Sequence, residues 1–463
     1  MIDLKQEQVE ELLEEILEKV EDETPSLVSI TRKINKINPL SFYEAAKYTE
    51  KDRVFWLNEK RDFCLVGVGR AHEIIAKGTK RFKKTSETWN RILEKAIINN
   101  PYKVEGTGIV ALGGMSFDPQ KKATQRWSKY KDSLFTIPEF MLTYVDDSYY
   151  YTVNLMVTKH DHPFQLANQL KEIEFKLFDT SQKKAKSWEL IEKEEIDVEK
   201  WKETVHHATE EIKNGYAEKI VLAREMRVKF NHSANHLDIL QGLIEKQRNS
   251  YIFAFNKDDD CFLGATPERL VKVEKELLYS TCLAGTAPRG ETEEEDKILG
   301  NELLHDDKNR REHDYVVQMI KEAIENYCTN VMIPKEPVLY PLKNLQHLYT
   351  PVTAVLKNGH SIFDVIEKLH PTPALGGEPK SAAMTFIRDF EHMDRGWYGA
   401  PIGWVDSNQN GEFAVAIRSA LIKGEEASLY AGCGVVDDSN PEVEYQETNI
   451  KFLPMLTVLG GQD

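Results

Sequence analysis

The chain has 463 residues and a mass of 53.3 kDa, enough for a large buried core in one or two domains. Hydrophobic residues make up 41% and charged residues 29%, with 25 glycines and 18 prolines, which excludes collagen-like, low-complexity and wholly disordered classes. The formal charge of −16 argues against a nucleic-acid-binding protein, whose surface depends on clustered lysine and arginine.

Residues 1–25 are predicted to form an acidic amphipathic helix. This segment carries ten acidic residues against Lys5 and Lys19, so it holds half of the net charge of the chain. Its apolar residues recur at helical spacing, from Val9 through Leu13 to Val20. We interpret the acidic face as solvated, and a partner-binding role as the second interpretation.

Residues 26–195 are predicted to form an N-terminal β-rich half. Strand-like runs lie at 63–69, 106–117 and 140–157, and the last is broken at 146–148 as in an antiparallel hairpin. The stretch 166–213 is charged and of helical character, with an exposed connector at 182–187. We place the boundary with the second region, 196–463, near this connector.

The second region alternates strands with helices. Strands are predicted at 219–228, 251–255, 261–273, 277–283, 412–422 and 429–436, with helical sequence at 293–328 and a final helix from Pro441 capped by Asn440. This order indicates an α+β fold. The simplest arrangement is two large, mostly antiparallel sheets with outer helices.

The distribution of cysteines and apolar runs predicts a cytoplasmic protein. The five cysteines are widely spaced and form no CxxC pair, so we expect reduced thiols and neither a disulfide framework nor a structural zinc site. The N-terminus has no basic region followed by an apolar stretch, and no apolar run approaches the length of a membrane span. We therefore expect no membrane contact.

The final helix carries the sharpest candidate site. Glu444, Glu447 and Lys451 are spaced i, i+3 and i+7, which places two carboxylates and an ammonium on one helical face. A surface stripe of ion pairs explains the same spacing. However, the small residues at 431–434 let backbone N–H groups approach an anion, and carboxylates beside an anion imply a cation.

Two basic residues on predicted strands are further candidates. Arg418 follows small neighbours on its strand, where it could hold a substrate carboxylate or form a structural salt bridge. Lys219 begins an apolar run, where its amine could act as a base or simply extend to solvent from a strand end. The residues alone leave both alternatives open.

Two carboxylates complete the set of candidates. A partly buried Glu268 could stay protonated and donate a proton, or it could pair with Arg269 or Arg289. Glu312 lies in a charged helical segment, where a single inward carboxylate could bind Mg²⁺ although an exposed position is the ordinary explanation.

Taken together, several dispersed strings resemble the chorismate-utilising enzymes, the family of anthranilate, aminodeoxychorismate, salicylate and isochorismate synthases. They are 219–224 (KIVLAR), 264–270 (GATPERL), 284–290 (AGTAPRG), 312–313 (EH), 369–377 (LHPTPALGG), 416–418 (AIR), 431–435 (AGCGV) and 444–451 (EYQETNIK). These strings lie between about residues 200 and 460, and the first half of the chain matches only loosely.

The resemblance implies a sandwich of two large sheets and a Mg²⁺ ion that holds the ring carboxylate of chorismate. It implies that Glu312 and Glu447 bind the metal, with Glu444 acting through water. The residues implied to contact substrate are Gly285, His347, Ala374, Leu375, Arg418, Gly432 and Lys451.

The resemblance also implies the reaction. Lys219 would activate water for attack at C2 while Glu268 protonates the departing C4 hydroxyl, which forms isochorismate. Ala374 stands where ammonia-using relatives typically carry threonine, so no glutamine amidotransferase subunit is expected. The GEPK string at 377–380 and the long N-terminal half resemble the menaquinone-pathway isochorismate synthases.

Three alternatives stay open at this point. A salicylate synthase would form isochorismate and then eliminate pyruvate in the same pocket. An isochorismate synthase of a siderophore pathway would share the chemistry. A catalytically silent binding subunit is the most distant alternative, and intact Lys219, Glu268, Glu312 and Glu447 argue against it.

Overall fold

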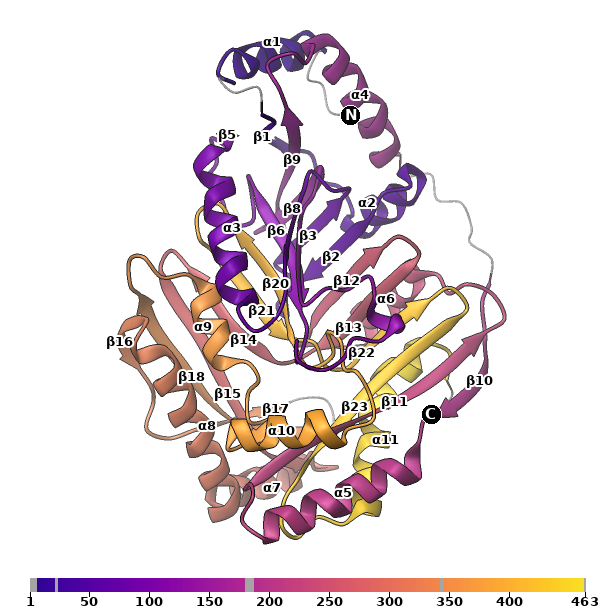
Figure 1. Ribbon diagram of the computed structural model, residues 1–463, viewed down its shortest axis with the longest axis vertical. Coiled ribbons are helices and arrows are strands. Elements are labelled where there is room, and N and C mark those ends of the chain that lie inside the picture. The colour runs from indigo at the N-terminus through magenta and orange to yellow at the C-terminus, as the bar shows by residue number, and fades with distance from the viewer. Residues whose placement is uncertain (1–5, 21–23, 180–186, 342–344, 462–463) are drawn as a thin grey trace.

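The computed structural model describes residues 6–20, 24–179, 187–341 and 345–461 (Figure 1). Its helices are α1 (Gln6–Leu17), α2 (Pro39–Ala45), α3 (Arg81–Lys95), α4 (Pro163–Leu177), α5 (Val198–Lys213), α6 (His236–Lys246), α7 (Glu293–His305), α8 (Asp307–Glu325), α9 (Ile362–Leu369), α10 (Lys380–Phe390) and α11 (Pro441–Val458), with short 3₁₀ turns at Ala46–Thr49 and Gln125–Trp127.

The described strands form two sheets. The larger sheet has thirteen strands, in the spatial order β10 (Leu190–Glu195), β11 (Lys219–Phe230), β23 (Glu426–Val435), β22 (Ser419–Lys423), β13 (Asp260–Thr266), β12 (Tyr251–Lys257), β2 (Arg53–Leu57), β3 (Phe63–Val68), β8 (Phe140–Val145), β9 (Ser148–Val157), β1 (Ser26–Ile34) and β5 (Ile97–Asn99), with β19 (Gly377–Glu378) beside β11. The pairing of β1 with β5 is parallel, and the other pairings described in this sheet are antiparallel.

The smaller sheet has ten described strands. Their order is β16 (Cys328–Met332), β18 (Leu345–Leu356), β15 (Leu277–Pro288), β14 (Arg269–Glu274), β21 (Gly411–Val415), β20 (Pro401–Asp406), β6 (Val110–Met115), β7 (Ser133–Ile137) and β4 (His72–Ala76), with β17 (Val338–Pro341) beside β18. Each sheet therefore takes strands from both halves of the chain.

Buried aromatic side chains pack the two sheets together. Trp56 and Phe253 of the larger sheet and Trp404 of the smaller sheet belong to one buried cluster, and all three are fully buried. Removing such a ring from water contributes about 1.5–3 kcal/mol. The predicted α+β sandwich with outer helices is thus confirmed, and Figure 1 shows α5, α10 and α11 gathered at one end with α1 and α4 at the other.

The N-terminal helix uses its apolar face within the molecule. Leu13 and Ile16 of α1 are buried, and Ile16 joins a cluster with Val28 and Val157 of the larger sheet. The helix also packs beside α4 (Figure 1). Within the predicted segment 1–25, the structure describes a helix over Gln6–Leu17, and residues 18–20 and 24–25 are not helical.

Two predicted long strands are each two strands that lie in different sheets. The run 261–273 divides into β13 of the larger sheet and β14 of the smaller sheet, and the run 412–422 divides into β21 and β22 in the reverse direction. Pro267 interrupts the first run, and Arg418, with φ of +50°, interrupts the second. The predicted position of Arg418 on a strand was therefore wrong, because the residue lies in a crossing between sheets.

The charged stretch predicted as helical contains an edge strand. Residues 190–195 form β10, which pairs with β11, and Lys229 of β11 forms a 3.0 Å ion pair with Glu192. Charged side chains suit an exposed sheet edge, and cross-strand pairing overrides the helical composition. The connector predicted at 182–187 falls mostly on residues 180–186, which lie outside the described residues.

Other predicted elements are largely confirmed. The hairpin at 140–157 is β8 and β9, and α11 begins at Pro441 with the Asn440 side chain accepting the N–H of Glu442 at 2.9 Å. The helical stretch 293–328 is interrupted at Asp306, whose side chain caps α8.

The described residues contain no disulfide and no helix suited to cross a membrane. All five cysteines are buried with free thiols. None of the described helices is both long and apolar enough to span a membrane.

Arg224 attaches α11 to strand β11. Its guanidinium is 2% exposed and donates to Thr448 Oγ1 at 2.7 Å and to the Glu195 carboxylate at 2.8 Å, with a further bond to Asn449. Its carbon Cζ also lies 4.8 Å from the Phe452 ring centre.

We predict that Arg224→Ala lowers the free energy of unfolding by about 3 kcal/mol, because it leaves a cavity and breaks a buried polar network. The midpoint of urea unfolding measures the effect. Lys229→Ala removes an exposed ion pair from the same strand and should leave the midpoint unchanged. Equal midpoints for both variants would contradict the role of Arg224.

Candidate functional site

The two crossings between the sheets lie side by side and are hydrogen-bonded to each other. The N–H of Ala265 donates to the carbonyl of Arg418 at 3.1 Å, and the N–H of Val415 donates to the carbonyl of Glu268 at 3.0 Å. Glu268 and Arg418 are therefore held at the same place, where the chain passes from one sheet to the other.

Glu268 sits in surroundings that favour its neutral form. The side chain is half-buried, and its burial raises the pKa to about 7 against the smaller opposing effect of Arg418. A carboxyl with this pKa holds its proton in a large part of the molecules near neutral pH. It is therefore able to act as a proton donor.

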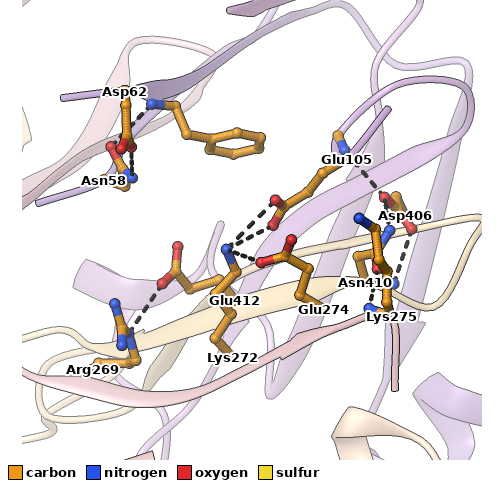
Figure 2. A network of polar contacts seen from close by, with 12 residues as sticks. Asn58, Asp62, Glu105, Arg269, Lys272, Glu274, Lys275, Asp406, Asn410 and Glu412 are labelled. Carbon is orange, nitrogen blue, oxygen red and sulfur yellow. Dashed lines mark hydrogen bonds and ion pairs between the residues drawn. The ribbon is translucent and has the colours of Figure 1, made fainter. Parts of the chain in front are cut away.

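The arginines considered as partners of Glu268 form ion pairs with other carboxylates. Arg269 pairs with Glu59 at 2.6 Å and with Glu412 at 3.2 Å, and Arg289 pairs with Asp296 at 2.7 Å. Figure 2 shows Arg269 directed towards Glu412, with Lys272 of the same strand between Glu105 and Glu274. These pairings leave Arg418 as the guanidinium that acts on the pKa of Glu268.

Arg418 links the crossing to the C-terminal helix. Its Nη1 donates to the carbonyl of Lys451 at 3.3 Å. Burial lowers the pKa of Arg418, while Tyr398, Glu447 and Glu268 act in the opposite direction. Arg418 and the polar face of α11 thus belong to one electrostatic site.

Glu447 and Lys451 lie on one face of α11 and form an ion pair. Lys451 Nζ donates to Glu447 Oε1 at 2.5 Å and to the carbonyl of Gly432 at 2.8 Å. Gly432 lies on β23, opposite Ala223 of β11. The helix therefore presents its ammonium group to the strand pair that also carries Lys219.

Lys219 lies over a neighbouring glycine. Val221 of β11 pairs with Gly434 of β23, and a Cβ atom added to Gly434 would lie 2.6 Å from Lys219 Cε and 3.3 Å from its Nζ. The absence of a side chain at Gly434 thus makes room for the lysine chain across β23. This arrangement places the amine on the face of the strand pair, rather than in solvent beyond the strand end.

The smaller sheet contributes His347. Its Nδ1 lies 2.9 Å from Thr286 Oγ1 and 3.3 Å from the carbonyl of Gly285. Burial lowers the pKa of His347, and the positive charges of Arg418 and Lys451 lower it further. The imidazole is therefore neutral near neutral pH and lies within the field of the two cations.

Gly285 forms the bulge where strand β15 meets helix α8. It has φ of +77°, and an added Cβ would lie 3.2 Å from the side chain of Asn309 in the first turn of α8. The next N–H, of Thr286, donates to Asn309 Oδ1 at 3.3 Å. A glycine is suited to this position because of both its backbone conformation and the close helix.

Ala374 and Leu375 lie on the loop between α9 and β19. Leu375 is buried, whereas Ala374 is exposed. The loop is attached to β11, since the carbonyl of Gly376 accepts the N–H of Val221 at 3.0 Å. Ala374 is thus the member of this pair that a substrate can reach.

Of the carboxylates predicted to bind metal, the structure describes the side chains of Glu444 and Glu447. Burial raises the pKa of Glu444, the nearby Glu447 raises it too, and Ser439 Oγ opposes this by donating to Glu444 Oε1 at 2.8 Å. The backbone of Glu312 lies in α8, but its side chain lies outside the described residues. Among the described side chains, no three acidic, histidine or cysteine residues form a group able to hold a metal ion.

Tyr398 is a site residue that the sequence analysis missed. An added Cβ on Gly432 would lie 3.3 Å from its hydroxyl, and Tyr398 acts on the pKa of Arg418. Burial raises the pKa of Tyr398 to about 12, so the hydroxyl remains a hydrogen-bond donor. The available signal was an aromatic residue between Gly396 and Gly399, which has no spacing that distinguishes it from core.

This arrangement combines proton transfer with anion binding. A neutral carboxyl at Glu268, the cations Arg418 and Lys451, and the amine of Lys219 are supplied by the crossings, α11 and the β11–β23 pair. Such a set can hold a small carboxylated molecule while one group donates a proton and another accepts one.

Comparison with known sequences finds a matching family and similar proteins. A family described as "Chorismate binding enzyme" matches residues 11–460. The chain is 42% identical over 443 residues to the isochorismate synthase MenF of Bacillus subtilis, with 94% of each chain covered. It is 32% identical to the salicylate biosynthesis isochorismate synthase of Pseudomonas aeruginosa, covering 95% of this chain and 92% of that protein.

Solved structures share the fold. The menaquinone-specific isochorismate synthase MenF of Escherichia coli superposes with a TM-score of 0.80 at 24% identity, covering 98% of this chain and all of that one. A putative 2,3-dihydroxybenzoate-specific isochorismate synthase of Bacillus anthracis superposes with a TM-score of 0.71 at 28% identity, covering 91% of this chain and all of that one.

We predict that Glu268→Gln gains stability relative to the wild-type protein as pH rises. The pKa of Glu268 is higher in the folded protein than its ordinary value of 4.5, so its stabilising contribution is present at low pH and is lost as pH rises through about 7. Glutamine does not titrate. Between about pH 5 and 8.5 the variant should gain about 2 kcal/mol on the wild type, as measured by urea unfolding. A difference independent of pH would contradict the raised pKa.

Proposed function

Because the chain belongs to the chorismate-binding enzyme family, we propose that it is an isochorismate synthase, an isomerase that converts chorismate to isochorismate. The observation that carries this proposal is the neutral carboxyl of Glu268 beside Arg418, at the junction of the two sheets. Loss of a hydroxyl group from a ring requires a proton donor of this kind, since hydroxide is a poor leaving group.

In the proposed reaction, water attacks C2 of the ring as the C4 hydroxyl departs. Lys219 accepts the proton that the attacking water releases, and Glu268 donates a proton to the leaving oxygen, which departs as water. The C–O bond at C2 forms, the C–O bond at C4 breaks, and the ring double bonds shift between them. One base and one acid balance the reaction, so no further reactant is needed.

The cations of the site are proposed to hold the carboxylates of the substrate. The guanidinium of Arg418 offers several donors in one plane, and Lys451 lies beside it on α11. The neutral His347 and the hydroxyl of Tyr398 can add uncharged hydrogen bonds. Together these groups orient the ring so that C2 and C4 meet the base and the acid.

The acidic face of α11 suits Mg²⁺. Glu444 and Glu447 offer hard oxygen ligands one turn apart, and Glu447 acts on the pKa of Glu444, as neighbouring carboxylates do. Mg²⁺ typically binds through one or two carboxylates with retained waters, and Glu312 is proposed as a further ligand. The bound ion would supply positive charge beside the ring carboxylate of the substrate.

We propose the menaquinone pathway as the route that this enzyme serves, in agreement with the relatives of that type and with the GEPK string at 377–380. Water rather than ammonia is the proposed nucleophile. The proposal therefore includes no glutamine amidotransferase subunit.

The first test is product identification. The purified protein incubated with chorismate and Mg²⁺ should yield isochorismate by chromatography, without pyruvate. Lys219→Ala should lower the rate about 10²–10⁴-fold while chorismate affinity changes little, because the base acts in the transition state. Lys229→Ala, on the same strand, should retain full activity. Salicylate with pyruvate would identify a salicylate synthase, and unchanged chorismate would overturn the proposed activity.

The second test concerns the metal. Glu447→Gln should raise the Mg²⁺ concentration needed for half-maximal activity by at least about tenfold, because a neutral amide is a weaker ligand. Glu442 lies on the same helix as Glu447, but it is an exposed carboxylate that pairs with Lys202 of α5, so Glu442→Gln should leave the requirement unchanged. Identical Mg²⁺ titrations of Glu447→Gln and wild type would count against the metal role of Glu447.

A further inference from the structure

Strand β11 has two separate neighbours on one edge. β19 pairs with Lys219 and Ile220, whereas the pairing with β10 extends only as far as Met226. The positions from Val221 to Ala223 lie between these two pairings. Their backbone groups on this edge require partners from elsewhere in the molecule.

A buried ion pair supplies these partners. Glu391 and Arg395 are each 4% exposed, and Arg395 donates from Nε and Nη2 to the two oxygens of Glu391, both at 2.7 Å. Glu391 Oε2 also accepts the N–H of Ala223 at 2.7 Å, and Arg395 Nη2 donates to the carbonyl of Val221 at 2.8 Å. The pair thus hydrogen-bonds to β11 as a neighbouring strand would.

The same arginine holds the loop that carries Ala374. Arg395 Nη1 donates to the carbonyl of Leu375 at 2.9 Å, and its Cζ lies 4.2 Å from the Phe117 ring centre. The N–H of Val221 donates to the carbonyl of Gly376 at 3.0 Å. One planar guanidinium therefore joins the loop to β11, two residues from Lys219.

The buried ion pair of Glu391 and Arg395 contributes little net stability. A buried ion pair loses the hydration of both charges, and apolar side chains of similar size often stabilise a protein equally well or better. However, three hydrogen bonds join the pair to Val221 and Ala223 of β11 and to Leu375 of the loop, and they fix these two chain segments relative to each other. Catalysis depends on such fixed geometry, because small displacements of reacting groups lower the rate strongly.

We propose that Glu391 and Arg395 are positioning residues, which set the distance between Lys219 on β11 and the substrate loop at 371–376. This inference rests on the proposed function, since it assumes that Lys219 and the loop meet the same substrate. Neither residue is proposed to touch chorismate. Their effect is exerted through β11 and through the Leu375 carbonyl.

The first variant is Arg395→Lys, which keeps the charge but loses the planar fork. We expect the KM for chorismate to rise at least about tenfold and kcat to fall, in the fraction that remains folded. A purely structural role would lower the folded fraction and leave the KM of the remainder unchanged. A KM within twofold of wild type would overturn the proposal.

The second test compares Arg395→Met with the double variant Glu391→Gln/Arg395→Met. The single change leaves a buried carboxylate without its cation, whereas the double change removes both charges, so the double variant should unfold at the higher temperature. Neither variant can donate to the carbonyls of Val221 and Leu375. We therefore expect kcat/KM to remain at least about 100-fold below wild type in both. Recovery of activity together with stability would overturn the positioning role.

Arg53→Lys is the matched control. Arg53 is also a buried arginine that donates to a backbone carbonyl, that of Tyr43 at 3.1 Å, but it belongs to strand β2. We expect this variant to lose stability without a change in KM. A KM increase equal to that of Arg395→Lys would show a general effect of destabilisation and overturn the proposal.

Amide hydrogen exchange separates this inference from the proposed activity. If the wild-type protein forms no isochorismate, the proposed function fails. The exchange experiment still reports whether Glu391 and Arg395 hold β11 and the loop together. We expect Arg395→Lys to exchange faster in both 219–224 and 371–378, with no change in the segments around Arg53. This result would support the role of Arg395 in joining β11 to the loop. Unchanged exchange in those two segments overturns it.

Discussion

The paired passage of the chain between the two sheets is the constraint on which the site depends. β13 and β22 are neighbours in the larger sheet, β14 and β21 are neighbours in the smaller sheet, and the backbone bonds at Ala265 and Val415 continue this pairing through the turn. Glu268 and Arg418 lie in the two turning segments. A change in strand register on either side would separate them.

Burial at this junction shifts the pKa values of Glu268 and Arg418 in opposite directions. It raises the pKa of Glu268 towards neutrality and lowers the pKa of Arg418, because low polarity disfavours any charged form. The acid thereby keeps its proton in a large part of the molecules near neutral pH, while the guanidinium retains its charge because its ordinary pKa is so high. The same environment thus produces a neutral donor and a permanent cation side by side.

The sequence permitted a prediction of the α+β sandwich and of the helical face of Glu447 and Lys451, because residue periodicity and helix spacing are local. It did not permit a prediction of the sheet crossings. The run 261–273 carries strand-forming residues on both sides of Pro267, Phe262 and Leu263 before it and Leu270, Val271 and Val273 after it, so it reads as one strand. The positive φ of Arg418 has no signature in its residue type.

Tertiary context also determines the meaning of charged pairs. Glu391 and Arg395 are spaced i, i+4, which is the spacing of an ordinary surface pair, yet they are almost fully enclosed. Residues 190–195 have a helical composition but pair along a sheet edge. In both cases the contact that determines the structure is with β11. Glu391 and Arg395 bind its backbone from more than 160 residues away, and residues 190–195 pair with its edge.

The interleaving of the two halves in both sheets has a consequence for biosynthesis. During translation β11 leaves the ribosome long before β23, the strand that lies beside it and carries Gly432 and Gly434. Until β23 has been made, the backbone groups on the edge of β11 that it pairs with have no permanent partner. Pairing between strands so far apart in the sequence slows folding. Unpaired strand edges in the incomplete chain also favour aggregation, and we expect chaperones to bind the chain at this stage.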